Sequence, residues 1–143
     1  MFREESLAKI LIVEDNALNI KLFCDLLAAH GHEPEAVTDS RTALDAARAF
    51  GPDLVITDIQ LPHVSGLELI RLIRADKQLA ATPIMAVTAY SARGDEERIR
   101  AAGAQAYVSK PISVVKFAQT VDALLGDAGK SEEPKAPEAP EAT

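Results

Sequence analysis

Short apolar runs alternate with amphipathic stretches along the first 126 residues of the chain. Several runs, such as Leu54-Val55-Ile56, are continuous, which is typical of strands covered on both faces. The stretches between them carry apolar residues three and four positions apart, the spacing of one buried helix face. Five strands are predicted, over residues 9–13, 33–37, 53–58, 83–88 and 106–110. Five helices are predicted, over residues 18–27, 43–50, 67–73, 95–103 and 113–125.

Local signals mark the ends of several of these elements. Asp15 or Asn16 can cap the first helix, and Gly31 suits the left-handed position after its end. Asp39 or Ser40 can cap the second helix in the same way. Gly51-Pro52 ends that helix, and Pro34 predicts that 33–37 is an edge strand.

The order of the elements predicts the fold class. Strands and helices alternate through short connections, which favours a parallel sheet because right-handed crossovers place the helices outside it. We therefore expect an α/β domain with a doubly wound parallel sheet and helices on both faces.

Composition and charge limit the kinds of protein to which the chain can belong. The 143 residues fit one domain, and no apolar run approaches the roughly 18 residues that span a bilayer. The first eight residues are too few and too acidic for a signal peptide, so we expect a cytoplasmic protein with no membrane partner. The single cysteine, Cys24, excludes a disulfide within the chain. The net charge of −7 argues against a nucleic-acid partner.

The chain divides into three parts by composition. Residues 1–8 are expected to be an N-terminal extension, and residues 9–126 the folded domain. Residues 127–143 contain three prolines and no large apolar residue, so they are expected to form a disordered acidic tail. The sequence suggests no further domain, and output is therefore expected through protein–protein contacts.

Polar residues follow four of the five predicted strands at their carboxyl ends. They are Glu14 and Asp15, Asp58, Thr88 and Lys110. In a doubly wound sheet these ends converge on one crevice. Three carboxylates there repel one another unless a cation binds, and a small hard ion such as Mg²⁺ fits oxygen ligands of this kind.

The same set of residues suggests phosphoryl chemistry. Asp58 can act as a nucleophile and form an aspartyl-phosphate, while Lys110 and Thr88 bind phosphoryl oxygens. Pro111 favours a cis peptide that aims Lys110 inward. Each signal also has a plainer interpretation: a solvated lysine, a strand-forming threonine, or acids that cap a helix or turn.

Residues 9–126 resemble a response-regulator receiver domain. The resemblance is carried, in order, by the segments LIVEDN, VITDIQLPHVSG, AVTAY and YVSKP. It implies the flavodoxin-like receiver fold with strand order 2-1-3-4-5. GDEERIRAAG and SKPISVVKF resemble, more narrowly, single-domain receivers that control the bacterial cell cycle.

The resemblance also implies roles for the residues at the strand ends. Asp58 corresponds to the acceptor of a phosphoryl group from phosphohistidine. Asp15, Asp58 and the Gln60 carbonyl correspond to direct Mg²⁺ ligands, and Glu14 to an acid that holds the metal through water. Lys110 corresponds to the phosphate-binding lysine.

Two further positions correspond to the switch of a receiver. Thr88 matches the switch hydroxyl, and Tyr107 the aromatic residue that turns inward on activation. An alternative for Tyr107 is a half-buried strand aromatic with its hydroxyl in water. The expected output surface is the fourth helix, fifth strand and fifth helix.

The partners implied are histidine kinases or histidine phosphotransfer proteins, as donors and as targets. Donor docking is expected near Asn16, Asn19 and Ile20 on the first helix, with Phe23 in the core. The chain is expected to be a monomer or a weak dimer. It is not expected to be an enzyme beyond its own phosphorylation and slow dephosphorylation.

The same residues suggest three alternative functions. An aspartyl-phosphate hydrolase of the haloacid-dehalogenase type needs an acid two residues after the nucleophile, where this chain has Gln60. A flavodoxin-like cofactor carrier needs a phosphate loop after the first strand, where Glu14 and Asp15 would repel a phosphate. A phosphate sink or shuttle for a histidine kinase stays open. The neutral Gln60 side chain argues against efficient hydrolysis of the acyl phosphate.

Overall fold

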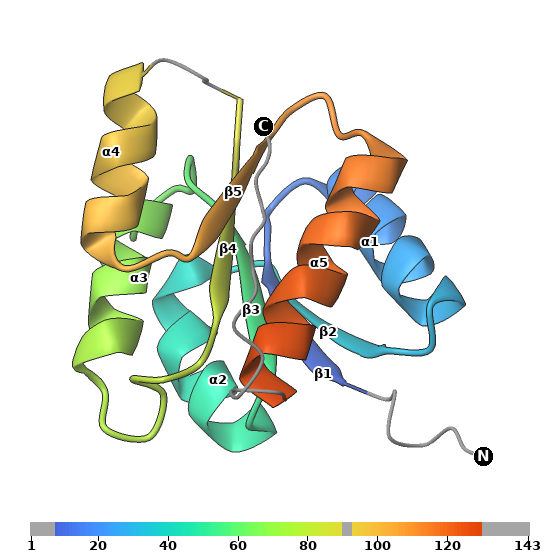
Figure 1. The fold of residues 1–143 in the computed structure, drawn as a ribbon. Coiled ribbons are helices and arrows are strands. Elements are labelled where there is room, and N and C mark those ends of the chain that lie inside the picture. Colours follow the sequence, from blue (N-terminus) through green and yellow to red (C-terminus); the bar gives the residue numbers. More distant parts are fainter. Residues whose placement is uncertain (1–7, 90–92, 130–143) are drawn as a thin grey trace.

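The computed structural model describes residues 8–89 and 93–129, which form a sheet flanked by helices (Figure 1). The strands are β1 (Lys9–Val13), β2 (Glu33–Val37), β3 (Leu54–Asp58), β4 (Ile84–Thr88) and β5 (Ala106–Ser109). The helices are α1 (Ala17–Ala29), α2 (Ala43–Phe50), α3 (Gly66–Ala75), α4 (Arg93–Ala102) and α5 (Val114–Gly129). A 3₁₀ turn, Ser40–Thr42, precedes α2. None of the helices described is both long and apolar enough to cross a membrane.

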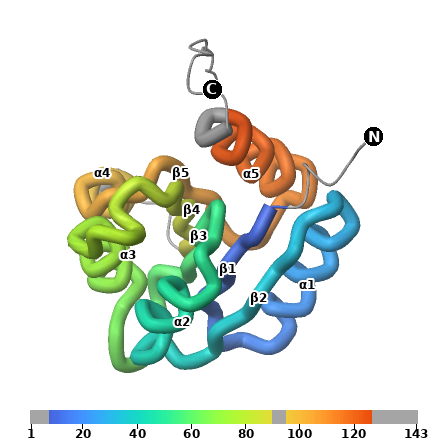
Figure 2. The backbone as a smooth tube through the Cα atoms, turned by 90° about the horizontal axis from the view of Figure 1, so that it is seen from below, coloured from blue at the N-terminus to red at the C-terminus, as the bar shows by residue number. Residues whose placement is uncertain are grey.

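The strands form one sheet in the order β2-β1-β3-β4-β5, and every neighbouring pair is parallel. Figure 2 shows α1 and α5 on one face, with α2, α3 and α4 on the other. The doubly wound fold and its strand order are thereby confirmed. The order reverses between β1 and β3, and ligands of such sheets bind beyond the carboxyl ends of the strands at that point.

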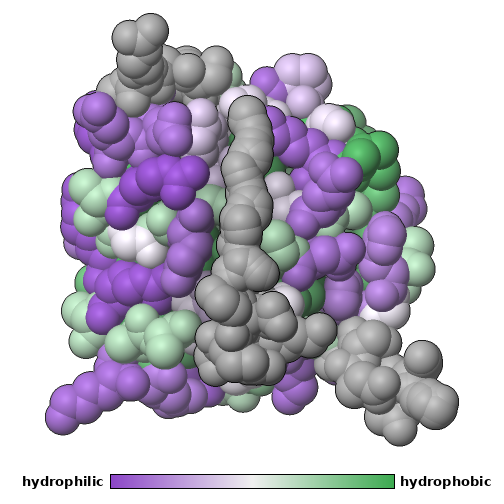
Figure 3. Space-filling model, in the orientation of Figure 1, coloured by the Kyte–Doolittle hydropathy of each residue, from purple (hydrophilic) through white to green (hydrophobic). Residues whose placement is uncertain are grey.

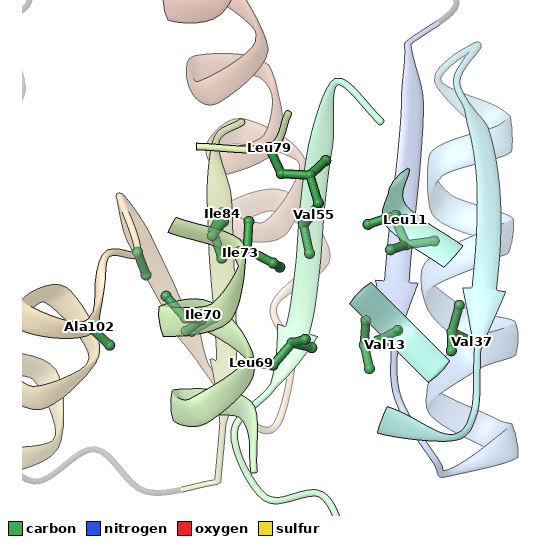
Figure 4. Packing of buried hydrophobic residues seen from close by; sticks show 14 of the residues in the cluster. Leu11, Val13, Val37, Val55, Leu69, Ile70, Ile73, Leu79, Ile84 and Ala102 are labelled. Atoms are coloured by element: carbon green, nitrogen blue, oxygen red, sulfur yellow. The ribbon is translucent and has the colours of Figure 1, made fainter. Parts of the chain in front are cut away.

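Alternate residues of the central strands fill two separate apolar layers. Leu11, Val13 and Val55 face α2 and α3, where they meet side chains such as Leu69 and Ile73 (Figure 4). The strand residues between them belong to the layer under α1 and α5: Ile10, Ile12, Leu54, Ile56, Met85 and Val87. Successive side chains of a strand point to opposite faces, so continuous apolar runs are needed to fill both layers.

A stacked pair of phenylalanines joins α1 to α5. The ring centroids of Phe23 and Phe117 are 5.1 Å apart, and both side chains are buried. The expected core position of Phe23 is confirmed. The stack joins the second turn of α1 to the first turn of α5 on the same face of the sheet.

Most predicted element ends agree with the structure. The Asn16 side chain caps α1 by accepting a hydrogen bond from the Asn19 N–H, at 3.0 Å. Gly31 adopts the positive φ angle expected after α1, and Gly51, which was predicted to end α2, does so with a positive φ angle as well. Asp39, however, caps the 3₁₀ turn, and α2 begins without a side-chain cap.

The predicted start of the tail, residue 127, lies within α5, and the division of the chain into extension, domain and tail stays a prediction. Helix α5 continues through Gly129, because no proline interrupts it and Gly126 is tolerated inside the helix. The remainder of the predicted tail, 130–143, and nearly all of the predicted extension, 1–7, lie outside the described residues.

Candidate functional site

The predicted polar residues meet at the carboxyl edge of the sheet. Glu14 and Asp15 directly follow β1, Asp58 ends β3, Thr88 ends β4, and Lys110 directly follows β5. The register places Asp58 opposite Val87 and Thr88 opposite Ser109, so the neighbouring strands end at nearly the same level. Residues up to 96 positions apart in sequence thus lie at one edge of the sheet.

Three carboxylates form the acidic part of the site. Oxygen atoms of Glu14, Asp15 and Asp58 all lie within 4.8 Å of one another. Glu14 is only 1% exposed and Asp58 5% exposed, whereas Asp15 reaches solvent. Burial, and then the charge of Asp58, raises the pKa of the Glu14 carboxyl. Close, poorly solvated carboxylates of this kind are stabilised by a bound cation.

The unmet hydrogen-bonding capacity of Glu14 supports a cation at this position. Its Oε2 accepts a hydrogen bond from the Asn16 N–H at 3.1 Å, but its buried Oε1 has no hydrogen-bond partner among the described residues. An oxygen-lined site that keeps some water suits Mg²⁺, and these residues fit that ion. Asp15 and Asp58 would hold it directly, with Glu14 beside them.

Gln60 lies next to the proposed acceptor. Its backbone N–H donates to Asp58 Oδ1 at 3.2 Å, and its side chain is exposed. The role of its carbonyl as a metal ligand stays a prediction. No acid occupies this position, which is the position where a haloacid-dehalogenase-type hydrolase would need one.

Lys110 supplies the positive charge of the site. Its Nζ lies 3.0 Å from Asp58 Oδ2 and 3.8 Å from Glu14 Oε1. The Lys110–Pro111 peptide is cis, as predicted. The lysine is therefore an ion-pair partner of the carboxylate that would carry the phosphoryl group, and the interpretation as a freely solvated lysine is wrong.

The loop between β3 and α3 is held against Asp58 by two residues that the sequence analysis did not single out for this role. A Cβ at Gly66 would overlap Asp58 O and would lie 2.6 Å from Ile59 Cα. The Ser40 hydroxyl donates to Pro62 O at 2.7 Å and accepts from the Val64 N–H at 3.1 Å. The Pro-to-Gly spacing of the loop was a visible signal for Gly66, but nothing in the sequence connects Ser40 to this loop.

Thr88 and Tyr107 lie on the α4 side of the site. Thr88 is buried, beside a pocket of about 100 Å³ that is also lined by Gln60 and by residues of α3 and α4. Tyr107 is half-buried, and its hydroxyl donates to Glu96 Oε1 at 3.2 Å. The half-buried strand position of the alternative is therefore confirmed, and the hydroxyl has a side-chain partner on α4; the inward turn of the ring stays a prediction.

The predicted docking residues have mainly local roles in the structure. Asn16 and Asn19 form the cap of α1, and Ile20 is half-buried. The spacing of apolar residues predicts Leu18, Leu22 and Val114 on the buried faces of their helices, but the structure exposes them. Val115, next to Val114, is exposed as well; Leu18 is 79% exposed and Val115 65% exposed. Figure 3 shows hydrophobic surface at the upper right, where α5 begins beside α1.

Glu14→Gln should stabilise the protein in a metal chelator at neutral pH and weaken Mg²⁺ binding. A raised pKa means that folding favours protonated Glu14, so this stabilising contribution is lost as pH rises through the folded-state pKa. Glutamine removes that dependence. We expect the melting temperature of the variant to exceed that of wild type by a few degrees in chelator. Added Mg²⁺ should narrow the difference, and a lower melting temperature in chelator would contradict the prediction.

Comparison with known proteins agrees with this geometry. Residues 10–122 match the response regulator receiver domain family. The chain is 52% identical over 119 residues to the polar-differentiation response regulators DivK of Brucella ovis and Brucella suis, a match that covers 83% of this chain and 97% of each relative.

Solved structures show the same architecture. The chemotaxis protein CheY4 of Vibrio cholerae superposes with a TM-score of 0.78 at 27% identity, covering 82% of this chain and 98% of that one. The receiver domain of the sensor histidine kinase PA1611 of Pseudomonas aeruginosa has a TM-score of 0.78 at 30% identity, covering 84% and 98%. That structure contains a magnesium ion in its active-site cleft.

Receiver domains of this family take part in phosphorelay signalling, in contact with histidine kinases and phosphotransfer proteins, and they bind Mg²⁺ at an acidic site. The family match covers most of the chain, and three carboxylates that could hold a metal ion lie together at the carboxyl edge of the sheet. The chain belongs to the response-regulator receiver family.

Proposed function

We propose that the chain accepts a phosphoryl group on Asp58 from a phosphohistidine and signals through contacts with other proteins. The observation that carries this proposal is the position of Asp58. It lies within 4.8 Å of two other carboxylates and 3.0 Å from Lys110 Nζ. The similarity to DivK supports a role in bacterial polar differentiation and cell-division control.

The transfer exchanges one bond to phosphorus for another. A carboxylate oxygen of Asp58 attacks the phosphorus, the phosphorus–nitrogen bond breaks, and the imidazole nitrogen leaves with the electron pair. Lys110 pairs with the charge that gathers on the phosphoryl oxygens, and Thr88 donates its hydroxyl to one of them. Mg²⁺ bound at the carboxylates neutralises further negative charge on the transferred group.

Labelling by a small phosphodonor tests the acceptor without a kinase. Incubation with acetyl phosphate and Mg²⁺ should add one phosphoryl group, seen by intact-protein mass spectrometry. A chelator should suppress the product strongly, because the metal and Lys110 together offset the charge of the acidic cluster. Equal labelling with and without Mg²⁺ would contradict the metal assignment.

We propose that the phosphohistidine donor docks on the exposed apolar residues at the start of α1 and α5. Leu18 and Leu22 belong to α1 and Val114 and Val115 to α5, two helices on the same face of the sheet (Figure 2) that follow the loops carrying Glu14, Asp15 and Lys110. Isolated surface leucines need no explanation, but several on neighbouring helices indicate an interaction site.

Leu18→Lys should slow phosphotransfer from a histidine kinase domain about 10-fold or more, because apolar anchors at the centre of an interface are the costliest to replace. Labelling by acetyl phosphate should stay unchanged, since Leu18 is exposed and is not part of the acidic cluster. Leu72→Lys, on the opposite face of the sheet, is the matched control. Equal transfer rates for both variants would place the donor elsewhere.

A further inference from the structure

The Tyr107 side chain is tied to α4 by a chain of polar contacts. Its hydroxyl donates to Glu96 Oε1 at 3.2 Å, and the other carboxylate oxygen of Glu96 accepts from Arg100 Nε at 3.2 Å. Arg100 Nη1 then donates to Gln105 O at 2.9 Å, only two residues before Tyr107. The contacts form a closed circuit between α4 and β5.

The turn at the far end of this circuit is itself anchored. Gln105 Oε1 accepts hydrogen bonds from Arg74 Nη2 and from the Ile84 N–H, at 2.7 and 2.8 Å. Arg74 also donates to Gly103 O at 2.9 Å. The α4–β5 turn is therefore held by α3 and β4, so the Glu96 end of the circuit is the part that is free to separate.

Few apolar side chains hold α4 against the rest of the domain, so the polar contacts contribute a larger share of its stability. Ile99 and Ala102 are its buried residues among the side chains described, and Ile99 is the large one. Tyr107 itself packs only partly against the core layer beneath α4. A single hydrogen bond contributes little to a well-packed helix, but it matters more where few apolar contacts hold the helix.

We propose that Glu96 is a latch that holds the Tyr107 ring against α4 and so opposes the switched state of the receiver. The inference rests on the proposed function, in which Thr88 donates to the phosphoryl group, and on the switch that the receiver resemblance implies, in which the Tyr107 ring turns inward on activation. Turning inward requires the hydroxyl to leave Glu96. The ring and the position of α4 are thereby coupled through one carboxylate.

The latch acts on a population of states. A phosphoryl group or its mimic favours the inward state, and the contact with Glu96 favours the outward state, so removal of the contact shifts the equilibrium inward without touching the acidic cluster. Burial, and then the Glu96 charge, raises the pKa of the Tyr107 hydroxyl, as expected if the two groups are in contact. That effect provides a second measurement, independent of phosphorylation.

The test compares Glu96→Ala with Glu97→Ala. Glu97 is an exposed neighbour on α4 with no hydrogen bond or ion pair among the described residues. Both substitutions therefore remove one negative charge and change helix propensity by the same amount, but only Glu96→Ala removes the contact with Tyr107. Beryllofluoride with Mg²⁺ serves as the phosphoryl mimic, titrated by NMR. We expect Glu96→Ala to bind it about 2- to 10-fold more tightly than wild type, in line with the loss of one hydrogen bond, and Glu97→Ala to match wild type.

A double-mutant cycle with Tyr107→Phe separates the latch from the loss of the Glu96–Arg100 pair. Phenylalanine lacks the hydroxyl, so Glu96→Ala should add little in that background. In the Tyr107-containing proteins, the ionisation midpoint of Tyr107, followed by its ring resonances, should fall in Glu96→Ala and stay unchanged in Glu97→Ala. The chain has only two tyrosines, and Tyr107→Phe identifies the signal.

The outcomes separate this inference from the proposed function. If wild type binds beryllofluoride but Glu96→Ala and Glu97→Ala bind it equally, the latch is overturned and the acceptor site stands. If no variant binds beryllofluoride, the proposed function fails. In that case the ionisation midpoint of Tyr107 still tests the latch. An unchanged midpoint in Glu96→Ala would show that Glu96 does not contact the Tyr107 hydroxyl.

Discussion

Asp58→Asn should abolish labelling by acetyl phosphate and phosphotransfer from a kinase domain. The amide keeps the shape of the carboxyl but is not a nucleophile for phosphorus, and it removes one of the three charges that hold the metal. The variant should remain folded, because the substitution also removes repulsion between Asp58 and Glu14. Intact-protein mass spectrometry measures the product, and circular dichroism checks the fold.

Asp45→Asn is the matched control for this loss. Asp45 is an exposed acid on α2 that pairs with Arg48. It is not one of the three carboxylates of the acidic cluster. It should be labelled as well as wild type. Labelling of Asp58→Asn at a level near that of the control would show that another side chain accepts the phosphoryl group, with Asp15 the first to examine.

Gly66→Ala should reduce phosphorylation about 100-fold and destabilise the fold by about 1–3 kcal/mol. The added methyl group would overlap the carbonyl oxygen of Asp58 and press on Ile59 Cα. Both are backbone atoms, so the strain cannot be relieved by a side-chain rotation. The expected relief is a shift of the β3–α3 loop, which moves the acceptor relative to Lys110 and the other two carboxylates.

Gly126→Ala tests whether the effect depends on that close approach. Apart from its chain neighbours and the backbone of its own helix, no described atom lies within 4 Å of a Cβ placed at Gly126, which is inside α5. Alanine there should raise stability by up to about 1 kcal/mol through helix propensity and leave the phosphorylation rate unchanged. Thermal unfolding and the acetyl phosphate assay compare the two variants. A Gly66→Ala protein that labels at the wild-type rate would contradict the packing argument.

The architecture could be predicted from sequence because its signals are local or periodic. Continuous apolar runs indicate strands buried on both faces, and the run in 54–56 fills both layers of the core. The glycines after α1 and α2 mark positions with positive φ. The right-handed crossover rule then converts the order of elements into a doubly wound sheet.

The composition of the site could also be predicted, for the same topological reason. Parallel strands all end at one edge, so the residue after each strand lies near that edge whatever the rest of the chain does. Glu14, Asp15, Asp58, Thr88 and Lys110 could therefore be placed together before any distance was known. Their pairing could not, since the 3.0 Å contact between Lys110 and Asp58 depends on the register of three neighbouring strands.

Contacts between distant segments were decided only by the tertiary structure. The bonds of Ser40 to the β3–α3 loop, and of Tyr107 to Glu96, join positions with no shared local pattern. Exposure on helices is likewise a tertiary property: Leu18 and Val115 have the residue types of core positions, but they reach solvent because none of the elements described packs over them. The sequence by itself determined the sheet and the chemical groups at its edge, because periodicity and chain order are written in it. Which groups touch, and which faces remain open to a partner, depended on how the layers pack.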